Sequence, residues 1–309
     1  MPEAPEVRII TDSIARFLVN GNLVSLDIVN EAFRKRTKNL EHLTLPQKVI
    51  TVKTKGKFCY IQFADNTALG IGYGMTGNIR IEPDALYLKK RGETEEQYMK
   101  HCAVRFGYEK DAHSGAFYYH DIRRFGFIHY LTERELKAKL AELGPSILDD
   151  TLLSCKELLK IWRKGNSKNV CVLLLNNQGL VSGIGNYLKA EALYRCKVHP
   201  LSVVRDIPDD VLYSLYTTVA QLAREAYLAG GASLYTFTGL DGDRSEFKHE
   251  LQVYNKRIDP LGHRVEQMET PDARTTYWVS AVQTIGVNTP IVISKPKIKI
   301  RVKSKLPNV

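Results

Sequence analysis

The chain has 309 residues, which is enough for two domains that each bury a core of their own. Hydrophobic residues make up 44% and charged residues 25%, as in an ordinary soluble globular protein, which argues against a disordered or fibrous chain. The 44 Lys and Arg against 34 Asp and Glu give a formal net charge of +10 at pH 7. This excess favours a polyanionic partner if the charge gathers on one face, and only aids solubility if it is evenly spread.

The cysteines are few and scattered, with no C-x-x-C pair among them. They are Cys59, Cys102, Cys155, Cys171 and Cys196. Such a set predicts reduced thiols in a cytosolic or nuclear protein. The longest apolar run, residues 170–175, is far too short to span a bilayer, and the opening does not resemble a signal peptide. We therefore expect a soluble intracellular protein without a membrane partner.

The N-terminal part of the chain shows two successive periodicities. Residues 8–18 carry apolar side chains at helical spacing, and Asn20-Gly21 follows as a stop signal. From residue 22 to about residue 130 the apolar period changes to two, with turn residues between the runs. This pattern predicts an antiparallel β-sandwich preceded by one helix.

Helical spacing returns later in the chain. It covers residues 133–143, stops at Gly144-Pro145, and resumes with short breaks over residues 151–235. Strand-like alternation follows at 251–254 and 275–283. The predicted class is α+β with two domains. The expected divisions are 1–143 for the β-sandwich domain, 144–249 for the helical domain, 250–284 for a strand-rich segment and 285–309 for a basic tail.

The basic tail has neither turn residues nor a core pattern between residues 293 and 305, so we expect it to be mobile. Two interpretations of its charge stand equally. The lysines contact nucleic acid or direct nuclear import, or the tail is simply a solvated terminus.

The first seven residues, Met1-Pro2-Glu3-Ala4-Pro5-Glu6-Val7, contain a potential nucleophile. Met1 is usually removed when a small residue such as proline follows, and Pro2 would then carry a free secondary amine. An α-amino group titrates near ~7.7–8.0, so a useful fraction is neutral and nucleophilic at pH 7. Its attack on the anomeric carbon of a sugar would give an iminium directly, with Glu3 placed to shuttle protons. The alternative is a frayed acidic tail, since termini are commonly disordered.

The opening has the pattern P-E-x-P-E-V, and further stretches match motifs that occur together with it. They are residues 52–58, the turn 74–77 (GMTG), the loop 121–126 (DIRRFG), the run 181–193 (VSGIGNYLKAEAL) and residues 250–254 (ELQVY) with 274–276 (RTT). With them, the chain resembles the Fpg/Nei DNA glycosylases, which excise oxidised bases through an N-terminal proline. The resemblance runs from residue 2 to about residue 283. It is closest to the Nei-like subgroup with a zincless finger, known from vertebrates and giant DNA viruses.

The resemblance implies a set of catalytic residues. Pro2 would be the Schiff-base nucleophile and Glu3 the general acid/base, while Glu6 would help to hold the terminus in place. The active-site lysine of the family falls on Lys57, whose ammonium would hold a phosphate and lower the pKa of the proline amine. An exposed strand lysine is the alternative for Lys57.

Other residues correspond to those that the family uses on DNA. Met75, Arg123 and Phe125 would fill the hole left when the damaged nucleotide is flipped out, a step that costs a few kcal/mol of unstacking. For Met75 and Phe125 the alternative is core packing, and Ile122 stands where the family usually has proline. His101 corresponds to a histidine that contacts a phosphate, with a structural histidine as the alternative.

The run 181–193 matches the family's V-x-G-I-G-N-x-x-x-x-E-A-L signature of a helix-two-turn-helix. Its glycines would let backbone amides and a helix N-terminus approach a phosphate, with Asn186 as a further donor. Glu191, on the helix, would support the active site.

The segment 250–284 departs from the family pattern at its metal site. The positions of the four zinc-ligand cysteines are taken by Leu261, Arg264, Val279 and Val282. His263 alone cannot hold a tetrahedral Zn²⁺, so we expect no zinc. The hairpin would instead be held by strand pairing and by apolar packing through Tyr277, Trp278, Val279 and Val282. Arg274 would lie at its tip and grip a phosphate, with an exposed turn arginine as the alternative.

The resemblance implies a bifunctional DNA glycosylase and abasic-site lyase that cuts the strand by β/δ-elimination without a metal or organic cofactor. Its expected partner is double-stranded DNA with oxidised bases or abasic sites, with single-stranded DNA as a second candidate. Oxidised pyrimidines and formamidopyrimidines are the favoured lesions, and a monomer in the nucleus, the cytoplasm or a viral factory is expected. The competing hypothesis is a non-catalytic module that binds damaged DNA or RNA. A small-molecule hydrolase finds no supporting motif.

Overall fold

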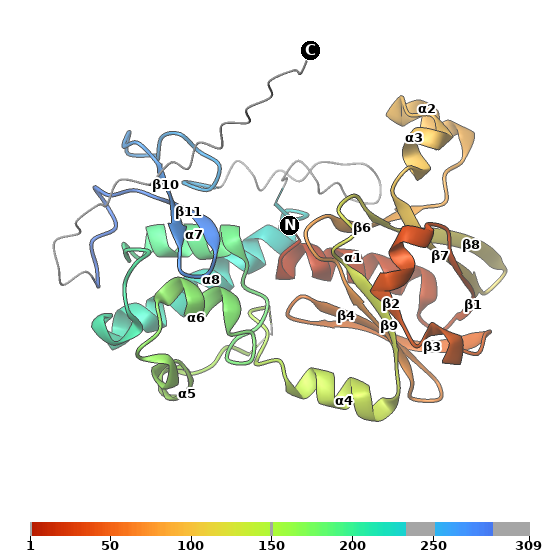
Figure 1. Ribbon diagram of the computed structural model, residues 1–309, viewed down its shortest axis with the longest axis horizontal. Coiled ribbons are helices and arrows are strands. Elements are labelled where there is room, and N and C mark those ends of the chain that lie inside the picture. Colours follow the sequence, from red (N-terminus) through yellow and green to blue (C-terminus); the bar gives the residue numbers. More distant parts are fainter. Residues whose placement is uncertain (1, 149–150, 233–250, 287–309) are drawn as a thin grey trace, which may run out of the picture.

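The computed structural model describes residues 2–148, 151–232 and 251–286 (Figure 1). A sheet-rich N-terminal half and a helical C-terminal half lie side by side, with the start of the first helix between them. The basic tail beyond residue 286 and residues 233–250 lie outside the described residues. None of the helices in the described part of the chain combines the length and apolar composition needed to cross a membrane.

The core of the N-terminal half is built from a leading helix and a nine-stranded sheet. Helix α1 spans Ala4–Leu18. The strands are β1 (Asn22–Ile28), β2 (Thr37–Lys38), β3 (Gln47–Lys55), β4 (Phe58–Phe63), β5 (Ala68–Gly72), β6 (Gly77–Ile81), β7 (Cys102–Lys110), β8 (His113–Asp121) and β9 (Phe127–Leu131). They pair in the order β2-β9-β5-β4-β3-β1-β7-β8-β6, antiparallel except for the short β2–β9 pair. Side chains from both ends of this order meet in one core, as predicted for a sandwich.

Helix α1 covers this core with an apolar face. Val7, Ile10, Ile14 and Leu18, at helical spacing, are all buried in it. The helix begins earlier than the predicted residue 8 because the proline in its first turn is compatible with a helix start. The backbone amide of Glu3 is satisfied by the Glu6 carboxylate at 2.8 Å. The start of the chain is therefore ordered, and the frayed-tail alternative is wrong.

Two short helices interrupt the region that was predicted to contain strands only. They are α2 (Ala85–Arg91) and α3 (Glu95–Met99), between β6 and β7 (Figure 1). Local capping explains them, because Asp84 accepts the amide of Tyr87 and Thr94 accepts that of Gln97. The remaining helical turns are of the 3₁₀ type: Glu31–Arg36, Leu40–His42, Arg163–Gly165 and Val204–Asp206.

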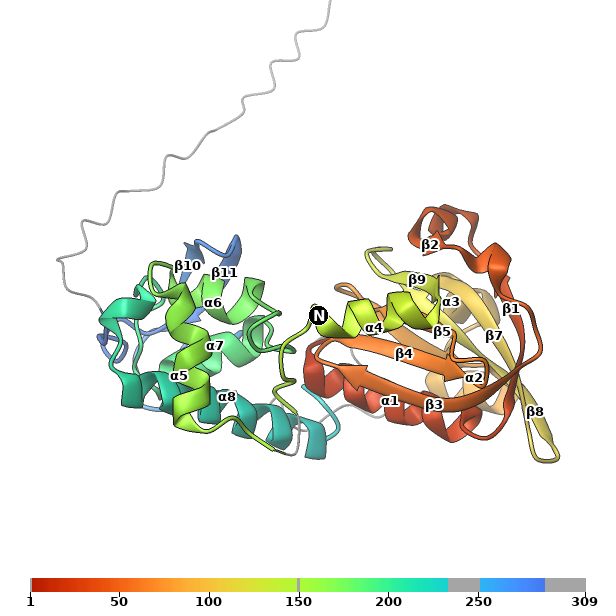
Figure 2. The same cartoon turned by 90° about the horizontal axis from the view of Figure 1, so that it is seen from below.

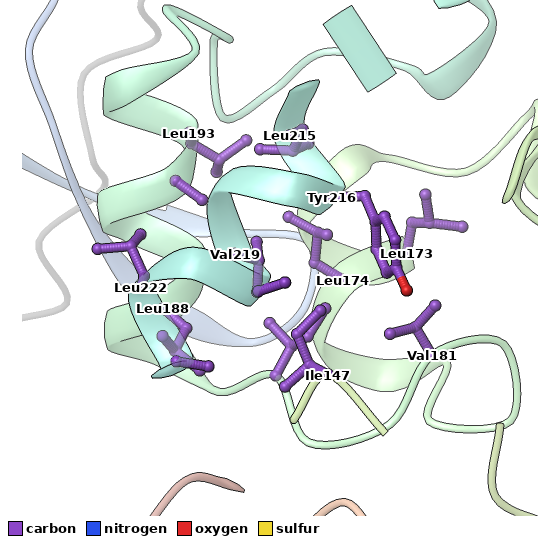
Figure 3. Close-up of a cluster of buried hydrophobic side chains, with 14 of the residues drawn as sticks. Ile147, Leu173, Leu174, Val181, Leu188, Leu193, Leu215, Tyr216, Val219 and Leu222 are labelled. Atoms are coloured by element: carbon purple, nitrogen blue, oxygen red, sulfur yellow. The ribbon is translucent and has the colours of Figure 1, made fainter. Parts of the chain in front are cut away.

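The C-terminal half is a helical bundle, so the predicted α+β class is confirmed. Helix α4 (Glu133–Ala141) still packs on the sheet of the first half, through Leu136 (Figure 2). The bundle itself contains α5 (Cys155–Trp162), α6 (Val170–Asn176), α7 (Asn186–Arg195) and α8 (Asp209–Leu228). Leu188 and Leu193 of α7 share its core with Val219 and Leu222 of α8 (Figure 3).

A β-hairpin follows, formed by β10 (Glu266–Thr270) and β11 (Arg274–Trp278). Two strand predictions here need correction. Residues 251–254 form bends and a turn, and β11 ends at Trp278 instead of running to residue 283. Three successive amides of the first segment bind one carboxylate, as described below, and this geometry is incompatible with a strand. Tyr277, Val279 and Val282 pack in a small core with Tyr194, Val253 and Val265.

Candidate active site

The start of the chain is held at the junction of the two halves. Pro2 is buried, and the amide of Ala4 donates to the carbonyl of Gly183 in the loop before α7 at 3.1 Å. Gly183 has φ of +104°, and a Cβ there would lie 2.7 Å from the Cβ of Ala4. A glycine is therefore required where the two segments meet.

The Glu3 carboxylate sits on the N-terminus of α7. It accepts the backbone amides of Tyr187 at 2.8 Å and Leu188 at 3.3 Å. A Cβ on Gly185 would lie 2.1 Å from Cδ of Glu3, so this glycine makes room for the carboxylate. Burial raises the pKa of Glu3 to about 7, although Lys57 and the amide of Tyr187 favour the ionised form. A carboxyl group with that pKa exchanges protons readily near neutral pH.

Glu6 lies directly behind Glu3. Besides the amide of Glu3, its side chain accepts the amide of Ala232 at 2.8 Å and the hydroxyl of Tyr187 at 3.2 Å. Burial raises the pKa of this carboxyl as well. These are the contacts that a residue holding the start of the chain against the helical half requires.

Lys57 is half-buried in the turn between β3 and β4. Burial lowers the pKa of its amine, the carboxylates of Glu3 and Glu6 oppose this, and the charge of Arg274 adds to it. The turn itself is pressed against the helical half, because a Cβ on Gly56 would lie 2.7 Å from Ser182. The structure thus brings Lys57 together with Glu3 and with the hairpin arginine.

Two loops of the sheet half that were assigned to void filling are in contact. A Cβ on Gly74 would lie 2.6 Å from the backbone carbon of Phe125, so the turn that carries Met75 packs closely on the second loop. Asp121 fixes this second loop by accepting the amides of Arg123 at 3.2 Å and Gly126 at 2.8 Å. The ring of Phe125 is 46% exposed and the Arg123 guanidinium lies over it at 4.8 Å. Core packing is therefore wrong for Phe125, whereas Met75 is half-buried.

His101 belongs to a positively charged group at the edge of this half. Burial lowers its pKa, and the cations Lys100, Arg80 and Arg124 lower it further. Its ring meets that of His120 edge-on with centroids 5.7 Å apart. The histidine is thus largely neutral at pH 7 and stands among cations.

The hairpin carries Arg274 as the first residue of β11, with its side chain exposed. Asn186, the first residue of α7, donates its side-chain amide to the carbonyl of Thr275 at 3.0 Å. The side-chain oxygen of Asn186 is buried without a hydrogen-bond partner in the described part of the chain. Asn186 therefore ties the hairpin to the helix that binds Glu3.

Comparison with known proteins finds relatives that match most of this chain. Residues 1–128 match the family model of the formamidopyrimidine-DNA glycosylase N-terminal domain. The formamidopyrimidine-DNA glycosylase of Shewanella denitrificans is 29% identical over 288 residues, which cover 92% of this chain and 100% of the relative. Over most of its length, the chain is similar to DNA glycosylases of the Fpg/Nei family. The formamidopyrimidine-DNA glycosylase of Legionella pneumophila is also 29% identical, over 262 residues that cover 84% of this chain and 89% of the relative.

Solved structures of this family share the fold. The MutM (Fpg) protein of Thermus thermophilus has a TM-score of 0.75 at 23% identity and covers 91% of this chain and 98% of its own. The Lactococcus lactis formamidopyrimidine-DNA glycosylase, bound non-covalently to DNA that contains an abasic site, has a TM-score of 0.74 at 20% identity. It covers 91% of this chain and 99% of its own.

The four positions that correspond to zinc ligands in the Fpg/Nei family do not suit a metal here. Leu261 is 69% exposed and Arg264 is also exposed, whereas Val279 lies in the small core of the hairpin. The residues that the structure describes include no group of three or more His, Cys, Asp or Glu able to hold a metal ion. Asp259 instead binds the hydroxyl of Tyr194 at 2.9 Å and the amide of His263 at 2.7 Å.

Two roles assigned from the Fpg/Nei resemblance differ in the structure. The first backbone amides of α7, expected to approach a phosphate, are bound by Glu3. Glu191, expected to support the active site, accepts the amides of residues 252, 253 and 254 at 2.8–2.9 Å. It therefore fixes the segment that leads to the hairpin.

Sequence reasoning missed two features of this candidate site. Tyr187 joins Glu3 through its amide and Glu6 through its hydroxyl, and only its place after Gly185-Asn186 could have suggested such a role. Lys189 and Asp272 form a fully buried ion pair between α7 and the hairpin. A lysine flanked by Leu188 and Ala190 gives no sign in the sequence that it is buried.

Proposed function

We propose that the protein is a DNA glycosylase of base excision repair that also cleaves the strand at the resulting abasic site. The observation that carries this proposal is the position of Glu3. Its carboxyl group has a pKa raised to about 7 by burial, follows the buried Pro2 and is fixed by the helical half. A proton donor beside a secondary amine is what imine chemistry on a sugar requires.

In the proposed reaction the Pro2 nitrogen attacks C1′ of the damaged nucleotide, and the bond from C1′ to the base breaks. The base leaves with the electron pair of that bond and takes up the proton that the amine loses. Opening of the sugar breaks the bond between C1′ and O4′, with O4′ taking a proton from Glu3 and the nitrogen becoming an iminium. Loss of a proton from C2′ then expels the 3′ phosphate, and a second elimination expels the 5′ phosphate. Water hydrolyses the remaining imine and restores the amine. Each step uses only groups of the protein, the substrate and water.

The cationic residues around this junction fit a DNA backbone. The charges of Glu3 and Arg274 both act on the pKa of Lys57, which supports a shared site for the two cations. We propose that they hold the phosphates flanking the flipped nucleotide, with His101 contacting the duplex further away. The paired loops of Met75 and of Arg123 and Phe125 would enter the hole in the base stack.

The finer assignments follow from the family resemblance. We propose that oxidised pyrimidines and formamidopyrimidines are the preferred lesions, and that the enzyme acts on them in double-stranded DNA. We also propose that no zinc is bound, because the corresponding positions carry Leu261, Arg264, Val279 and Val282.

Borohydride trapping tests the proposal. Borohydride reduces an iminium to a stable amine and so joins the protein to the DNA. The wild type, Pro2→Gly and Glu3→Gln are compared on duplexes that carry thymine glycol or an abasic site. Mass spectrometry of the N-terminal peptide first shows that Met1 has been removed.

We expect a covalent adduct with the wild type and a sharp decrease with Pro2→Gly. Glu3→Gln should bind the abasic duplex but trap far more slowly on the duplex with a damaged base. Absence of an adduct from Met1-free wild type on both duplexes would refute the lyase assignment. Salt-dependent binding without any adduct would then favour a passive binder of damaged DNA.

A further inference from the structure

A buried ion pair joins helix α7 to the turn of the β10–β11 hairpin, and the proposed reaction makes no direct use of it. The amine of Lys189 lies 2.6 Å from Oδ2 of Asp272, and both side chains are 0% exposed. Removing two charges from water is costly, so such a pair is a weak argument for stability. Buried pairs are better attested as devices that fix the position of one element on another.

The ion pair is connected to the backbone of Arg274. The second carboxylate oxygen of Asp272 lies 2.5 Å from the hydroxyl of Thr270. The same hydroxyl lies 2.9 Å from the carbonyl of Arg274 and 2.8 Å from the hydroxyl of Thr276. The Thr270 hydroxyl has a single proton, so it donates either to Asp272 or to the carbonyl of Arg274 at any one time. The hydroxyl of Thr276 can donate to Thr270. Two contacts therefore lead from the lysine-bound carboxylate to Arg274.

Helix α7 holds the hairpin at a second point and the active site at a third. Its first residue, Asn186, donates to the carbonyl of Thr275, directly after Arg274. Its first amides bind Glu3. One helix thus fixes the position of Arg274 relative to the carboxylate of Glu3. The charges of both residues shift the pKa of Lys57.

The hairpin needs such an anchor because its own structure is small. It has two strands of five residues each, and an isolated two-stranded hairpin is marginally stable in water. Its small apolar core lies beyond the strand ends at Val265 and Val279, at the opposite end from the turn. The ion pair is the buried polar contact at the turn end, next to Arg274.

We propose that Lys189 and Asp272 are positioning residues, which hold Arg274 in the orientation that grips a phosphate of the damaged strand. This inference rests on the proposed function, since it assumes that Arg274 binds DNA. The placement of the arginine is thus assigned to a buried ion pair between α7 and a hairpin that has no cysteine at the four positions corresponding to zinc ligands.

A double-mutant cycle tests the proposal. The variant Lys189→Met with Asp272→Asn removes both charges, keeps similar volumes and leaves an oxygen for Thr270. It is made in the wild type and in Arg274→Ala. The dissociation constant for a duplex with a tetrahydrofuran abasic analogue is measured for all four proteins over a range of salt concentrations.

In the wild-type background we expect the double variant to bind about tenfold more weakly. The plot of log binding constant against log salt concentration should become shallower by about one unit, which corresponds to the loss of one phosphate contact. In the Arg274→Ala background the same substitutions should change affinity less than about twofold, because the residue they position is already absent. Equal losses in both backgrounds, or unchanged affinity in the first, would overturn the proposal.

Thr270→Val provides a second test if the double variant does not fold. It removes only the hydroxyl between Asp272 and Arg274, leaves the ion pair intact and conserves volume, so the same non-additivity with Arg274→Ala is expected. Neutralising the exposed pair of α4 with Glu133→Gln and Lys137→Met is the matched control, and it should leave binding unchanged. Binding to the analogue needs no chemistry, so a wild type that fails to trap would refute the proposed function without obscuring this cycle.

Discussion

The amide of Tyr187 donates to the carboxylate of Glu3 at 2.8 Å, although the two residues are 184 positions apart. The group proposed to move protons at the start of the chain is therefore positioned by a helix of the other half. The N-terminal end of that helix favours a negative charge, whereas burial favours the neutral form. Burial, opposed by the charge of Lys57 and by the amide of Tyr187, raises the pKa of Glu3 to about 7.

The first prediction concerns the space in which Glu3 lies. Gly185 has φ of −124°, which any residue adopts, so Gly185→Ala introduces no backbone strain. Its Cβ would lie 2.1 Å from Cδ of Glu3, and the carboxylate must move. We expect a folded protein whose rate of borohydride trapping falls ~100-fold, since a 1 Å misplacement of a reacting group costs about that much.

Gly179→Ala is the matched control in the same half. Its Cβ would lie 3.1 Å from the carbonyl oxygen of Glu142 and meet no atom of Glu3 within 4 Å, so trapping should stay within a factor of about two to three of the wild type. If borohydride trapping is as fast with Gly185→Ala as with Gly179→Ala, the position of Glu3 seen in the structure is not the one used in the reaction.

The second prediction is a pH profile. Protonated Glu3 is needed as the acid, so kcat/KM for the damaged-base duplex should decrease as the pH rises through about 7. The Pro2 amine must be neutral, which produces a rising limb on the acid side, and the profile should be bell-shaped. In Glu3→Gln, whose residual activity lacks this titration, the decrease near pH 7 should disappear. Persistence of that limb in Glu3→Gln would assign it to another group.

The pH dependence of the free energy of unfolding reports the pKa of Glu3 independently of the reaction. Because the pKa of Glu3 is higher in the folded state than the ordinary value of 4.5, the folded state binds more protons between these pH values. The free energy of unfolding therefore decreases as the pH rises from about 4.5 to 7. Relative to Glu3→Gln, the wild type should lose at most ~3 kcal/mol over this range in urea unfolding. The exposed Glu96→Gln serves as the control and should track the wild type.

Local sequence patterns predicted much of the fold. The apolar spacing of residues 8–18 and the glycine run before Asn186 gave the leading helix and the loop ahead of α7. The Pro2 and Glu3 motif could be assigned only through the family resemblance, because a short acidic opening by itself does not distinguish a site from a loose terminus. The burial that changes the pKa of Glu3 depends on the second half and is not visible locally.

Two errors in the C-terminal half share one physical cause, which is long-range pairing of polar groups. Residues 251–254 alternate like a strand, yet three of their amides converge on Glu191, some sixty positions earlier. Lysine is a residue type usually found at the surface, yet Lys189 is buried and paired with Asp272. Neither partnership has a signature at short sequence separation, because the fold alone brings the two segments together.

The third prediction concerns metal. The hairpin is held by a small apolar core and by the pair of Lys189 and Asp272, and Val279 fills a position that corresponds to a zinc ligand. Dialysis against EDTA should therefore leave the Tm and the trapping rate unchanged, and elemental analysis should show only substoichiometric zinc. Tightly bound zinc in a one-to-one ratio, with unfolding on its removal, would contradict this view of the hairpin.

The fourth prediction separates the DNA-facing loop from the protein core. Phe125 and Ile122 lie in one loop and are each 46% exposed, so replacing either with alanine should change the free energy of unfolding by less than ~0.5 kcal/mol. Only Phe125 is stacked under Arg123, with the guanidinium 4.8 Å from its ring centre.

Phe125→Ala should therefore decrease excision from duplex DNA about tenfold, because stacking of a base on an aromatic ring is worth ~1–3 kcal/mol. Ile122→Ala should have little effect on the same substrate. On a single-stranded abasic oligonucleotide, where no hole in a base stack needs filling, the two variants should trap at similar rates. If Phe125→Ala lowers both reactions equally, the ring contributes to general binding or to loop structure, and filling the void has to be assigned to Met75 and Arg123 alone.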